Sequence, residues 1–474
     1  MTVYTIFAIV AAAAFVLALI RFVVKRPPNI LITFLQDFVG AFFIFSGFVK
    51  AVDPLGTSYK MHEYFEAFAS EGLRPLWEYL ANFSTFMAVV MIATELFVGL
   101  MLIIGWKPRF TAGLIWLLTL FFTFLTGYTY LSGFCISKLF IVLSLGVILL
   151  LASVAFPAKQ SQRINLFFFS IGAIVALFLF SKFSNMAFMC AFKEGGMKVT
   201  DCGCFGDFIK LKPWETFYKD CVLDIMILVL VLNAKHVRPA FNPLINNILA
   251  GITGVVSLFL CLYCVYWNEP IIDFRPYAIG NDIADLRKEK KPPVYQMSFI
   301  YRSNKTHQDK EFSYDDVMKS KIDAAEYDTC VDRKQILLDP GIPARILGLY
   351  INNDDGEITD SILGNPDYSL MVVSWNLGKT SESAFKELNA LQAPSEKAGI
   401  KFFALVTNDG HVDEFRHKNQ TAWPFYYADE TPIKTMMRSN PGLMLLKKGV
   451  VVNKWHCHHF PTFDELNKQY FSKK

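Results

Sequence analysis

The sequence lacks the short motifs on which nucleotide-binding proteins and many hydrolases depend. It has no phosphate-binding glycine-rich loop, no serine-nucleophile elbow and no H-E-x-x-H motif. It is also short of charge, since Asp, Glu, Lys and Arg make up 19% of 474 residues and the formal net charge is only +4. A charge this small gives no electrostatic footprint for nucleic acid, so no nucleic-acid partner is expected.

Apolar residues are abundant instead. Hydrophobic residues make up 53% of the chain, and 45 of them are Phe, which is too apolar for one soluble fold. The first 265 residues carry long apolar runs with charges between them, while the remainder resembles ordinary soluble sequence. The chain is therefore predicted to be a membrane protein with two modules.

Apolar runs of about 20 residues, the length that crosses a bilayer core, predict about eight transmembrane helices. They lie near 3–24, 30–50, 84–105, 110–128, 136–156, 164–184, 216–233 and 243–266. No Lys or Arg precedes the first run, and Arg21, Lys25 and Arg26 follow it. We interpret this run as an anchor inserted with its N-terminus outward rather than as a secretory signal.

The distribution of basic residues predicts the orientation, because positive charge collects in cytoplasmic loops. Alternate short loops hold the basic groups, at 21–26, 107–109, 159–163 and 235–238. The opposite face receives 51–83, 185–215 and everything after Trp267. The sequence therefore predicts a multi-pass protein of a bacterial inner membrane, with the N-terminus and the C-terminal domain extracytoplasmic.

A C-x-C motif within 200–207 is the sharpest chemical signal. None of the nine cysteines falls in a predicted cytoplasmic loop, and disulfides persist in the oxidising compartment outside. Cys202 and Cys204 could close only a tight, strained disulfide, and strained disulfides are labile; Gly203 and Gly206 would allow the turn. The flanking aspartates are unfavourable to a thiolate. Structural bridges to other cysteines, or half of a metal site, are the alternatives.

Several segments resemble known membrane proteins. Residues 38–50 with 53–56 resemble the first helix of DoxX-type proteins, and 93–99 with 201–207 and 212–215 resemble the related MauE branch. The resemblance implies a four-helix membrane bundle associated with thiol redox or with maturation of exported proteins; MauE is implicated in making a disulfide-rich periplasmic enzyme.

The resemblance covers roughly 30–130 and 197–233, and the chain departs from it at 131–196. In similar chains the helix ending near Tyr128 runs almost directly into the C-G-C loop, whereas two extra spans intervene here. Two spans return the chain to the same side of the membrane, so the loop is still expected outside.

Ionisable residues within membrane spans are costly and are functional candidates. Glu95, in the middle of the third span, is the first candidate, to orient a polar headgroup or to relay a proton if electrons pass to a quinone. The alternative is an interhelical hydrogen bond, which we favour for Asp37 and Asp224 near helix ends. Residues 59–68 have apolar positions at helical spacing and predict an amphipathic helix on the membrane surface or over the bundle.

The soluble part is divided into an uncertain α+β region at 268–365 and a thioredoxin-like domain at 366–474, following a membrane domain at 1–267. Charges and paired prolines mark a linker at 288–293. Strands are expected at 294–301, 335–338, 370–375, 402–406, 443–446 and 450–455, and helices near 381–398 and 411–418. This order, with Asn440-Pro441 before the third of the last four strands, resembles a thioredoxin fold with its cis-proline.

The nucleophilic positions of a thioredoxin are missing. Trp375 is followed by 376–379, Asn-Leu-Gly-Lys, where C-x-x-C would stand. The domain is therefore predicted to be a docking platform whose groove beside Pro441 offers backbone groups to an extended peptide. The histidine-rich segment 456–459 follows the last strand, but successive strand residues point to opposite faces, so no metal site is predicted.

Two functions of different class follow. In the first, the chain is a membrane thiol-disulfide oxidoreductase with Cys202, Cys204 and Glu95 as catalytic candidates, a lipid quinone as electron acceptor and exported proteins as clients. In the second, it is a non-catalytic scaffold in an envelope complex and its cysteines are structural. A quinone-sized cleft beside Glu95 would favour the first, and an exposed apolar face on the outer domain the second.

Overall fold

A computed structural model describes most of the chain. The described residues are 3–25, 29–134, 197–199, 203–209, 211–319, 322–323, 325–327, 329–339, 341–408 and 410–472. The chain divides into two compact units, Met1–Arg275 and Pro276–Lys474, and each is considered by itself.

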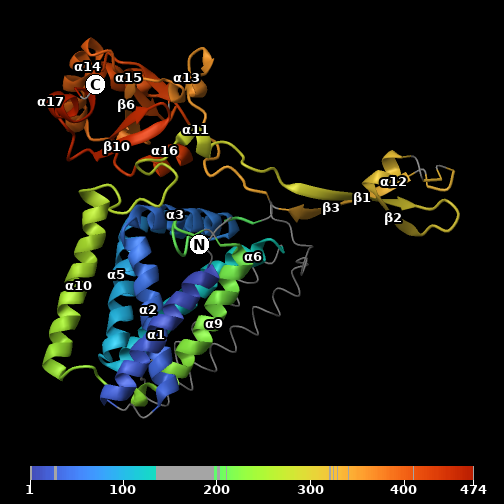
Figure 1. Cartoon of the computed structure of the whole chain (residues 1–474), viewed down its shortest axis with the longest axis vertical. Coiled ribbons are helices and arrows are strands. Elements are labelled where there is room, and N and C mark those ends of the chain that lie inside the picture. The colour runs from blue at the N-terminus through green and yellow to red at the C-terminus, as the bar shows by residue number, and fades with distance from the viewer. Residues whose placement is uncertain are drawn as a thin grey trace. The chain divides into compact units, whose positions relative to one another are not determined.

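The first unit is helical (Figure 1). Its elements are α1 (Val3–Lys25), α2 (Ile30–Ala51), α3 (Pro54–Glu71), α4 (Arg74–Ala81), α5 (Ser84–Ile104), α6 (Pro108–Ser132), α9 (Pro213–Leu232), η2 (Ala234–His236) and α10 (Pro243–Tyr266). Among the described helices, α1, α2, α5, α6 and α10 are long and apolar enough to cross a membrane. These helices coincide with five of the predicted spans and indicate a multi-pass membrane protein. The spans predicted at 136–156 and 164–184 lie outside the described residues.

Helix α9 differs from the prediction of an apolar span over 216–233. It has 20 residues but is not among the five apolar helices, because charged side chains occupy its first half. Its first two turns carry Lys219 and Asp220, and Asp224 follows one turn later. Its buried residues Leu223, Ile227 and Leu230 nevertheless face the interior of the bundle.

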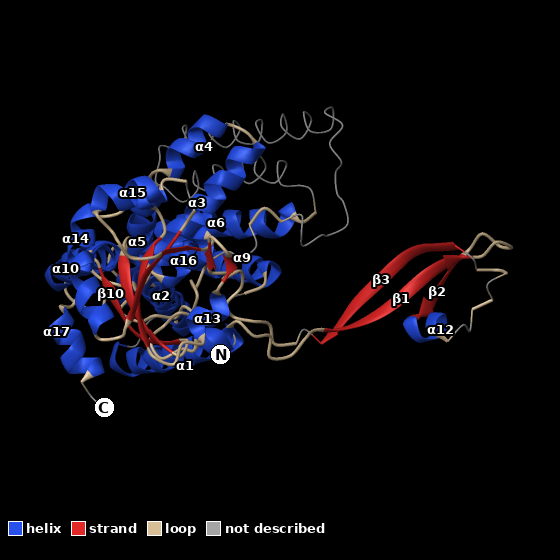
Figure 2. Cartoon of the chain, turned by 90° about the horizontal axis from the view of Figure 1, so that it is seen from above, coloured by secondary structure: helices blue, strands red, loops and turns tan. Residues whose placement is uncertain are grey.

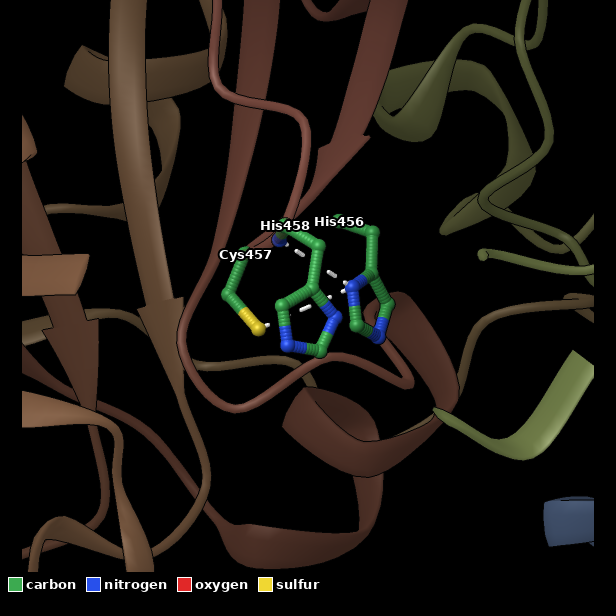
Figure 3. A group of neighbouring side chains, drawn as sticks. All are labelled: His456, Cys457 and His458. Carbon is green, nitrogen blue, oxygen red and sulfur yellow. Dashed lines mark hydrogen bonds between the residues drawn. The ribbon is translucent and has the colours of Figure 1, made fainter. Parts of the chain in front are cut away.

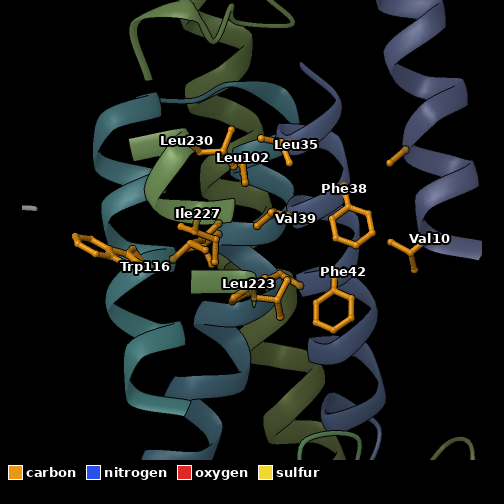
Figure 4. Close-up of a cluster of buried hydrophobic side chains, with 14 of the residues drawn as sticks. Val10, Leu35, Phe38, Val39, Phe42, Leu102, Trp116, Leu223, Ile227 and Leu230 are labelled. Atoms are coloured by element: carbon orange, nitrogen blue, oxygen red, sulfur yellow. The ribbon is translucent and has the colours of Figure 1, made fainter. Parts of the chain in front are cut away.

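The core of the first unit lies where α2, α5, α6 and α9 meet (Figure 4). Aromatic side chains of α2 recur every fourth residue, so Phe34, Phe38 and Phe42 share one face of the helix. Phe38 and Phe42 also meet Phe7 of α1. The apolar face therefore joins the first span to the bundle.

Helix α3 lies across one end of this bundle (Figure 1). Asp53 begins it by accepting a hydrogen bond from the backbone of Gly56. Its buried face packs on α6: Phe68 meets Tyr128 edge to face with ring centroids 4.8 Å apart, and Tyr64 shares a 2.7 Å hydroxyl hydrogen bond with Thr129. The predicted amphipathic helix at 59–68 is confirmed, and it covers the bundle.

The segment after α10 folds back around a buried arginine. Arg275 is 1% exposed and forms ion pairs with Glu269 at 2.9 Å and Asp273 at 2.7 Å. Burial acts to lower the pKa of the Arg275 guanidinium, but the two carboxylates outweigh it and hold that pKa above its ordinary value. Arg275 therefore remains charged and fixes this turn.

The second unit contains two sheets (Figure 2). The strands are β1 (Val294–Arg302), β2 (Asp309–Ser313), β3 (Thr329–Asp339), β4 (Asn352–Asn353), β5 (Gly356–Glu357), β6 (Tyr368–Ser374), β7 (Lys401–Val406), β8 (Phe425–Tyr427), β9 (Gly442–Lys447) and β10 (Val450–His456). The helices are α11 (Ile283–Leu286), α12 (Tyr314–Met318), α13 (Thr359–Leu363), η3 (Leu377–Lys379), α14 (Glu382–Lys397), α15 (Val412–Asn419), α16 (Glu430–Met436), α17 (Phe463–Leu466) and η4 (Asn467–Phe471).

The larger sheet has the strand order β10-β9-β6-β7-β8-β4-β5. β6, β7 and β8 are parallel, whereas β9 and β10 are antiparallel to their neighbours. Alternate residues of β6 enter two different cores: Leu370 and Val372 pack with α14, and Met371 and Val373 pack with α13 and α16. The strands and helices predicted from 370 onward are all present, and the Asn440–Pro441 peptide bond is cis as expected.

The smaller sheet has the order β2-β1-β3 and is antiparallel. It contains both strands predicted in the uncertain region, at 294–301 and 335–338. Its strands carry paired charges across the ladder, such as Arg302 with Asp309 at 2.7 Å and Lys334 with Glu311 at 2.7 Å. Hydrogen bonds from these cations lower the pKa of both carboxyl groups.

Candidate functional site

Helices α2 and α5 approach closely because glycines occupy their contact. A methyl group on Gly40 would lie 2.8 Å from the carbonyl oxygen of Gly99, and one on Gly99 would lie 2.9 Å from the carbonyl oxygen of Gly40. Gly47, two turns along α2, faces Leu96 in the same way. Small residues of this kind allow membrane helices to pack backbone to backbone. The close packing brings the polar residues farther along both helices within hydrogen-bond reach.

Lys50 and Glu95 form a buried ion pair between these two helices. Lys50 Nζ lies 2.8 Å from both carboxylate oxygens of Glu95, and the two side chains are only 3% and 2% exposed. Ser46, one turn earlier on α2, donates its hydroxyl to Glu95 Oε1 at 3.0 Å and accepts from Lys50 Nζ at 3.2 Å. Lys50 Nζ also lies 4.5 Å from the ring centroid of Phe122. Each charge therefore has a partner, as a buried ion pair requires.

The C-terminal half of the C-G-C loop is held against this end of the bundle by Phe205. Its side chain is 1% exposed and meets Phe42 edge to face, with ring centroids 5.9 Å apart. Gly203 and Gly206 both have positive φ, at 61° and 51°. The predicted need for glycine in this turn is confirmed, because other residues rarely adopt that conformation.

Cys204 is buried at the base of this loop, and its carbonyl oxygen lies 3.5 Å from Ser46 Oγ. The other two predicted catalytic residues have different outcomes. Glu95 lies beside Ser46 in the ion pair described above. Cys202 lies outside the described residues, so its position relative to Cys204 stays a prediction.

Two adjoining pockets meet at Cys204. One has a cavity volume of about 30 Å³ and is bounded by α3, where Lys60, Met61 and Tyr64 line it. The other has a cavity volume of about 20 Å³, and Glu95 and Lys219 line it. Lys50, Phe122 and Cys204 line both. The sulfur-bearing loop and the buried ion pair therefore border the same space.

A second polar group lines the inner pocket from α9. Lys219 Nζ lies 2.8 Å from Asp220 Oδ1, and both side chains are at most 9% exposed. Thr126 of α6 donates to Asp220 Oδ2 at 3.1 Å. One turn along, Thr123 donates to Asp224 at 2.6 Å, which confirms the interhelical role favoured for Asp224.

Asp37 has the same kind of role at the other end of α2. It pairs with Arg21 of α1 at 3.1 Å, and Arg21 also donates to the carbonyl of Ile103 at 2.5 Å. Asp37 therefore joins two helices as expected, but through an ion pair rather than through the hydrogen bond predicted for it. This cluster is separate from the site near Cys204.

Sequence reasoning missed Lys50, Ser46, Lys219 and Asp220 as site residues. A signal was present for Lys50, since it is a basic residue at the end of an apolar run on the face predicted to receive few basic residues. A lysine there can reach one turn back along its own helix, which places it opposite a carboxylate in a neighbouring span. Lys219 and Asp220 could be found only by recognising that charged residues occupy the first half of α9.

Cys221, Cys261, Cys264 and Cys330, which lie outside the loop, form no disulfide. Cys261 and Cys264 are buried in α10, and Cys261 packs against Val89 and Ile92 of α5. Cys261 therefore acts as a small apolar side chain, which is a common role of cysteine in membrane helices.

In the second unit, neutral side chains form hydrogen bonds at the end of β6, next to residues 376–379, where a C-x-x-C motif would stand. Ser374 donates to Asn440 Oδ1 at 2.8 Å, and Asn440 Nδ2 donates to the carbonyl of Asn376 at 2.8 Å. Asn376 Oδ1 accepts from the backbone of Lys379 at 2.9 Å and begins η3. This edge carries no thiol at 376–379, and Asn440 links it to the cis peptide.

Comparisons with known proteins bear on the membrane unit. No curated protein and no solved structure matches the chain significantly. Residues 28–137, which include α2 to α6 and both members of the Lys50–Glu95 pair, match the family model described as methylamine utilisation protein MauE.

Proposed function

We propose that the chain is a membrane-bound thiol-disulfide exchange protein that acts in the maturation of exported proteins. The observation that carries the proposal is the position of Cys204, which borders two pockets together with the buried Lys50–Glu95 pair. The match of residues 28–137 to the MauE family model supports it. The charge distribution supports an orientation with this end of the bundle and the C-terminal domain outside the cytoplasm.

The proposed reaction is an exchange between a client dithiol and the Cys202–Cys204 disulfide. A client thiolate attacks this disulfide, and one of its sulfurs leaves as a thiolate. A second client thiolate then attacks the client sulfur of the mixed disulfide, and the other site sulfur leaves as a thiolate. The client gains a disulfide, while Cys202 and Cys204 become thiols. Two electrons and two protons must then leave the site before another cycle.

The polar groups of the site have defined tasks in this scheme. The Lys50 ammonium lines the same pockets as Cys204 and favours a thiolate there, which offsets the unfavourable flanking aspartates. The Lys50–Ser46–Glu95 hydrogen bonds form a short path along which a proton can move away from the thiols. Glu95 therefore acts as the proton acceptor of the site.

A lipid quinone is the proposed electron acceptor. The pocket lined by Glu95 and Cys204 has a cavity volume of about 20 Å³, which is room for a water molecule and not for a quinone ring. This pocket is therefore not the quinone-sized cleft expected beside Glu95, and the quinone is proposed from the resemblance alone.

The C-terminal domain is proposed to be a thioredoxin-like platform that presents the client. Its central β6-α14-β7 unit, the β9-β10 hairpin and the cis Asn440–Pro441 peptide are the features that support this. The absence of cysteine at 376–379 leaves exchange to the membrane unit. An extended client segment would add to the backbone groups beside Pro441.

The test is the redox state of Cys202 and Cys204 in native membranes, measured by differential alkylation and mass spectrometry with and without quinone depletion. We expect the pair to be mostly oxidised and to become reduced when quinone is removed. The exposed Cys330 serves as an internal control, because its alkylation should not respond to quinone. A pair that stays in one state under both conditions would replace this proposal with the scaffold function.

A further inference from the structure

The turn that follows β10 gathers two histidines and one cysteine. β10 ends at His456, and Cys457 and His458 lie in a turn rather than in the strand. The alternation of side chains along the strand therefore stops before Cys457. The objection that adjacent strand residues point to opposite faces does not apply to these three residues. Within the described part of the chain, these three residues are the group whose nitrogen and sulfur ligand atoms all lie within 4.8 Å of one another (Figure 3).

Hydrogen bonds fix the backbone of this turn. The Cys457 N–H donates to Ser439 Oγ at 2.8 Å, and the Ser439 hydroxyl donates to the carbonyl of Pro441 at 2.6 Å. The His459 N–H closes the turn on the carbonyl of His456 at 2.9 Å. Because the fold sets the backbone, the three side chains are held on the same side of the turn without a bound ion.

The separations fit a tetrahedral metal site. With Zn–S near 2.3 Å and Zn–N near 2.0–2.1 Å, a tetrahedral ion places a sulfur and a nitrogen ligand about 3.6 Å apart and two nitrogens about 3.3 Å apart. Cys457 Sγ lies 3.6 Å from His456 Nδ1. The two imidazole rings are stacked with centroids 4.9 Å apart, so a modest rotation of the exposed His458 would bring in the third ligand.

In this arrangement, His456 Nδ1 carries a lone pair, which is what binding to a metal requires. The His458 backbone N–H donates to His456 Nδ1 at 3.3 Å, so Nδ1 is unprotonated in this arrangement and the neutral ring carries its proton on Nε2. That bond is long, and an ion at Nδ1 would replace it with a much stronger interaction. His456 is 6% exposed while His458 is exposed, so one ligand is preset and the approach from solvent is open.

We propose that His456, Cys457 and His458 bind one Zn²⁺, with a water molecule in the fourth position. One thiolate and two imidazoles form a donor set that suits borderline-soft ions and does not suit Mg²⁺ or Ca²⁺. Three protein ligands with a fourth position open are the arrangement of exchangeable or reactive zinc rather than of a closed structural site. Zinc binding also removes the Cys457 thiol from oxidation. The proposal does not depend on thiol exchange in the membrane unit.

The experiment uses the reduced full-length protein in detergent, titrated anaerobically with Zn²⁺ against a chromophoric chelator and, separately, with Co²⁺. We expect one equivalent of Zn²⁺ and a thiolate-to-cobalt charge-transfer band in the near ultraviolet. Cys457→Ser should abolish that band, and His458→Gln should weaken Zn²⁺ binding by about 100-fold or more, since loss even of an outer-shell partner costs about 10–100-fold. Both side chains are at least partly exposed, so these variants test the ligands without removing a core residue.

Two matched variants serve as controls. His459→Gln changes the neighbouring exposed histidine, and Cys330→Ser removes the exposed thiol of β3. Both should bind Zn²⁺ and Co²⁺ as the wild type does. Loss of the charge-transfer band in Cys330→Ser, unchanged binding in both Cys457→Ser and His458→Gln, or binding of Cu⁺ without any of Zn²⁺ would overturn the assignment.

Discussion

The buried pair between α2 and α5 makes a quantitative prediction about its two single variants. Lys50→Met leaves the Glu95 carboxylate with only the Ser46 hydroxyl, and Glu95→Gln leaves the Lys50 ammonium opposite a neutral amide. Removing one partner of a buried ion pair costs about 3–5 kcal/mol, because the other charge stays desolvated. We expect each single variant to lose stability in this range.

The double variant measures the interaction free energy between Lys50 and Glu95 apart from the cost of changing each residue. Replacing both charges with neutral groups of similar size is often close to neutral, so Lys50→Met/Glu95→Gln should be more stable than either single variant. The resulting coupling free energy should be at least about 3 kcal/mol. Neutral hydrogen bonds between membrane helices average about 0.6 kcal/mol in such cycles, so the magnitude distinguishes a charged pair from an ordinary polar contact.

Unfolding can be followed in mixed micelles with increasing dodecyl sulfate, using a maleimide that fluoresces on reaction with thiols. Cys261 and Cys264 are buried in α10, and Cys261 packs against α5, so they react when the bundle opens. Arg74→Gln, at an exposed helix-surface ion pair, is the control and should leave the midpoint unchanged. Additive costs of the two single variants, or a coupling near 0.6 kcal/mol, would refute the reasoning.

Three further predictions concern other parts of the chain. Gly99→Leu should separate α2 from α5, because even a methyl group there would lie 2.9 Å from the carbonyl oxygen of Gly40; faster thiol reaction in the same micelle assay would show it, and unchanged kinetics would contradict it. Arg275→Gln should destabilise the turn after α10 by about 3–5 kcal/mol by leaving its two carboxylates unpaired, seen as faster amide exchange at 268–275 but not in α5. Arg302 lowers the pKa of Asp309, so its stabilising contribution is present above the ordinary carboxyl pKa and is lost as the pH falls through the lowered value. Amide exchange in β2, scaled for intrinsic rate, should therefore become faster between about pH 7 and about pH 3, and Arg302→Gln should reduce that difference.

The apolar spans were predictable because length and hydropathy alone decide them. Helices α2, α5 and α10 were placed within one or two residues, while α3 begins before and ends after the amphipathic segment predicted at 59–68. Helix α9 was harder, since it carries Lys219 and Asp220, which pair with each other, and Asp220 also accepts from Thr126 of α6. The partner on α6 lies far away in the sequence.

The central strands of the second unit were predictable because they are buried on both faces. β6, β7 and β9 read as continuous apolar runs, and such runs indicate central strands. β4 and β5 have two residues each and are held by pairing rather than by composition, so the sequence gives them no signal. The same limit applies to β8, whose three residues follow a buried tryptophan.

Two residues of the candidate site, Glu95 and Cys204, were named from the sequence, and their catalytic roles stay a prediction. Glu95 was named because a carboxyl group in the middle of a span demands an explanation, and Cys204 because a C-x-C motif stands in a predicted outer loop together with two glycines and two aspartates. The partner Lys50 depends on the glycine contact between α2 and α5, which is a three-dimensional fact. The cluster at His456 was rejected for a sound reason, strand alternation, that ceased to hold one residue after the strand ended.

The side chain of Asn440 ties the end of β6 to the peptide before β9 with two hydrogen bonds that involve no sulfur. A disulfide at this edge would give the surface two shapes, one for each oxidation state. The two hydrogen bonds of the Asn440 amide give it a single shape that oxidants and reductants do not change. A ligand that recognises this edge would bind the same surface before and after any electron transfer. Its binding and release therefore cannot be controlled by a redox change at this edge and must depend on a change in the ligand.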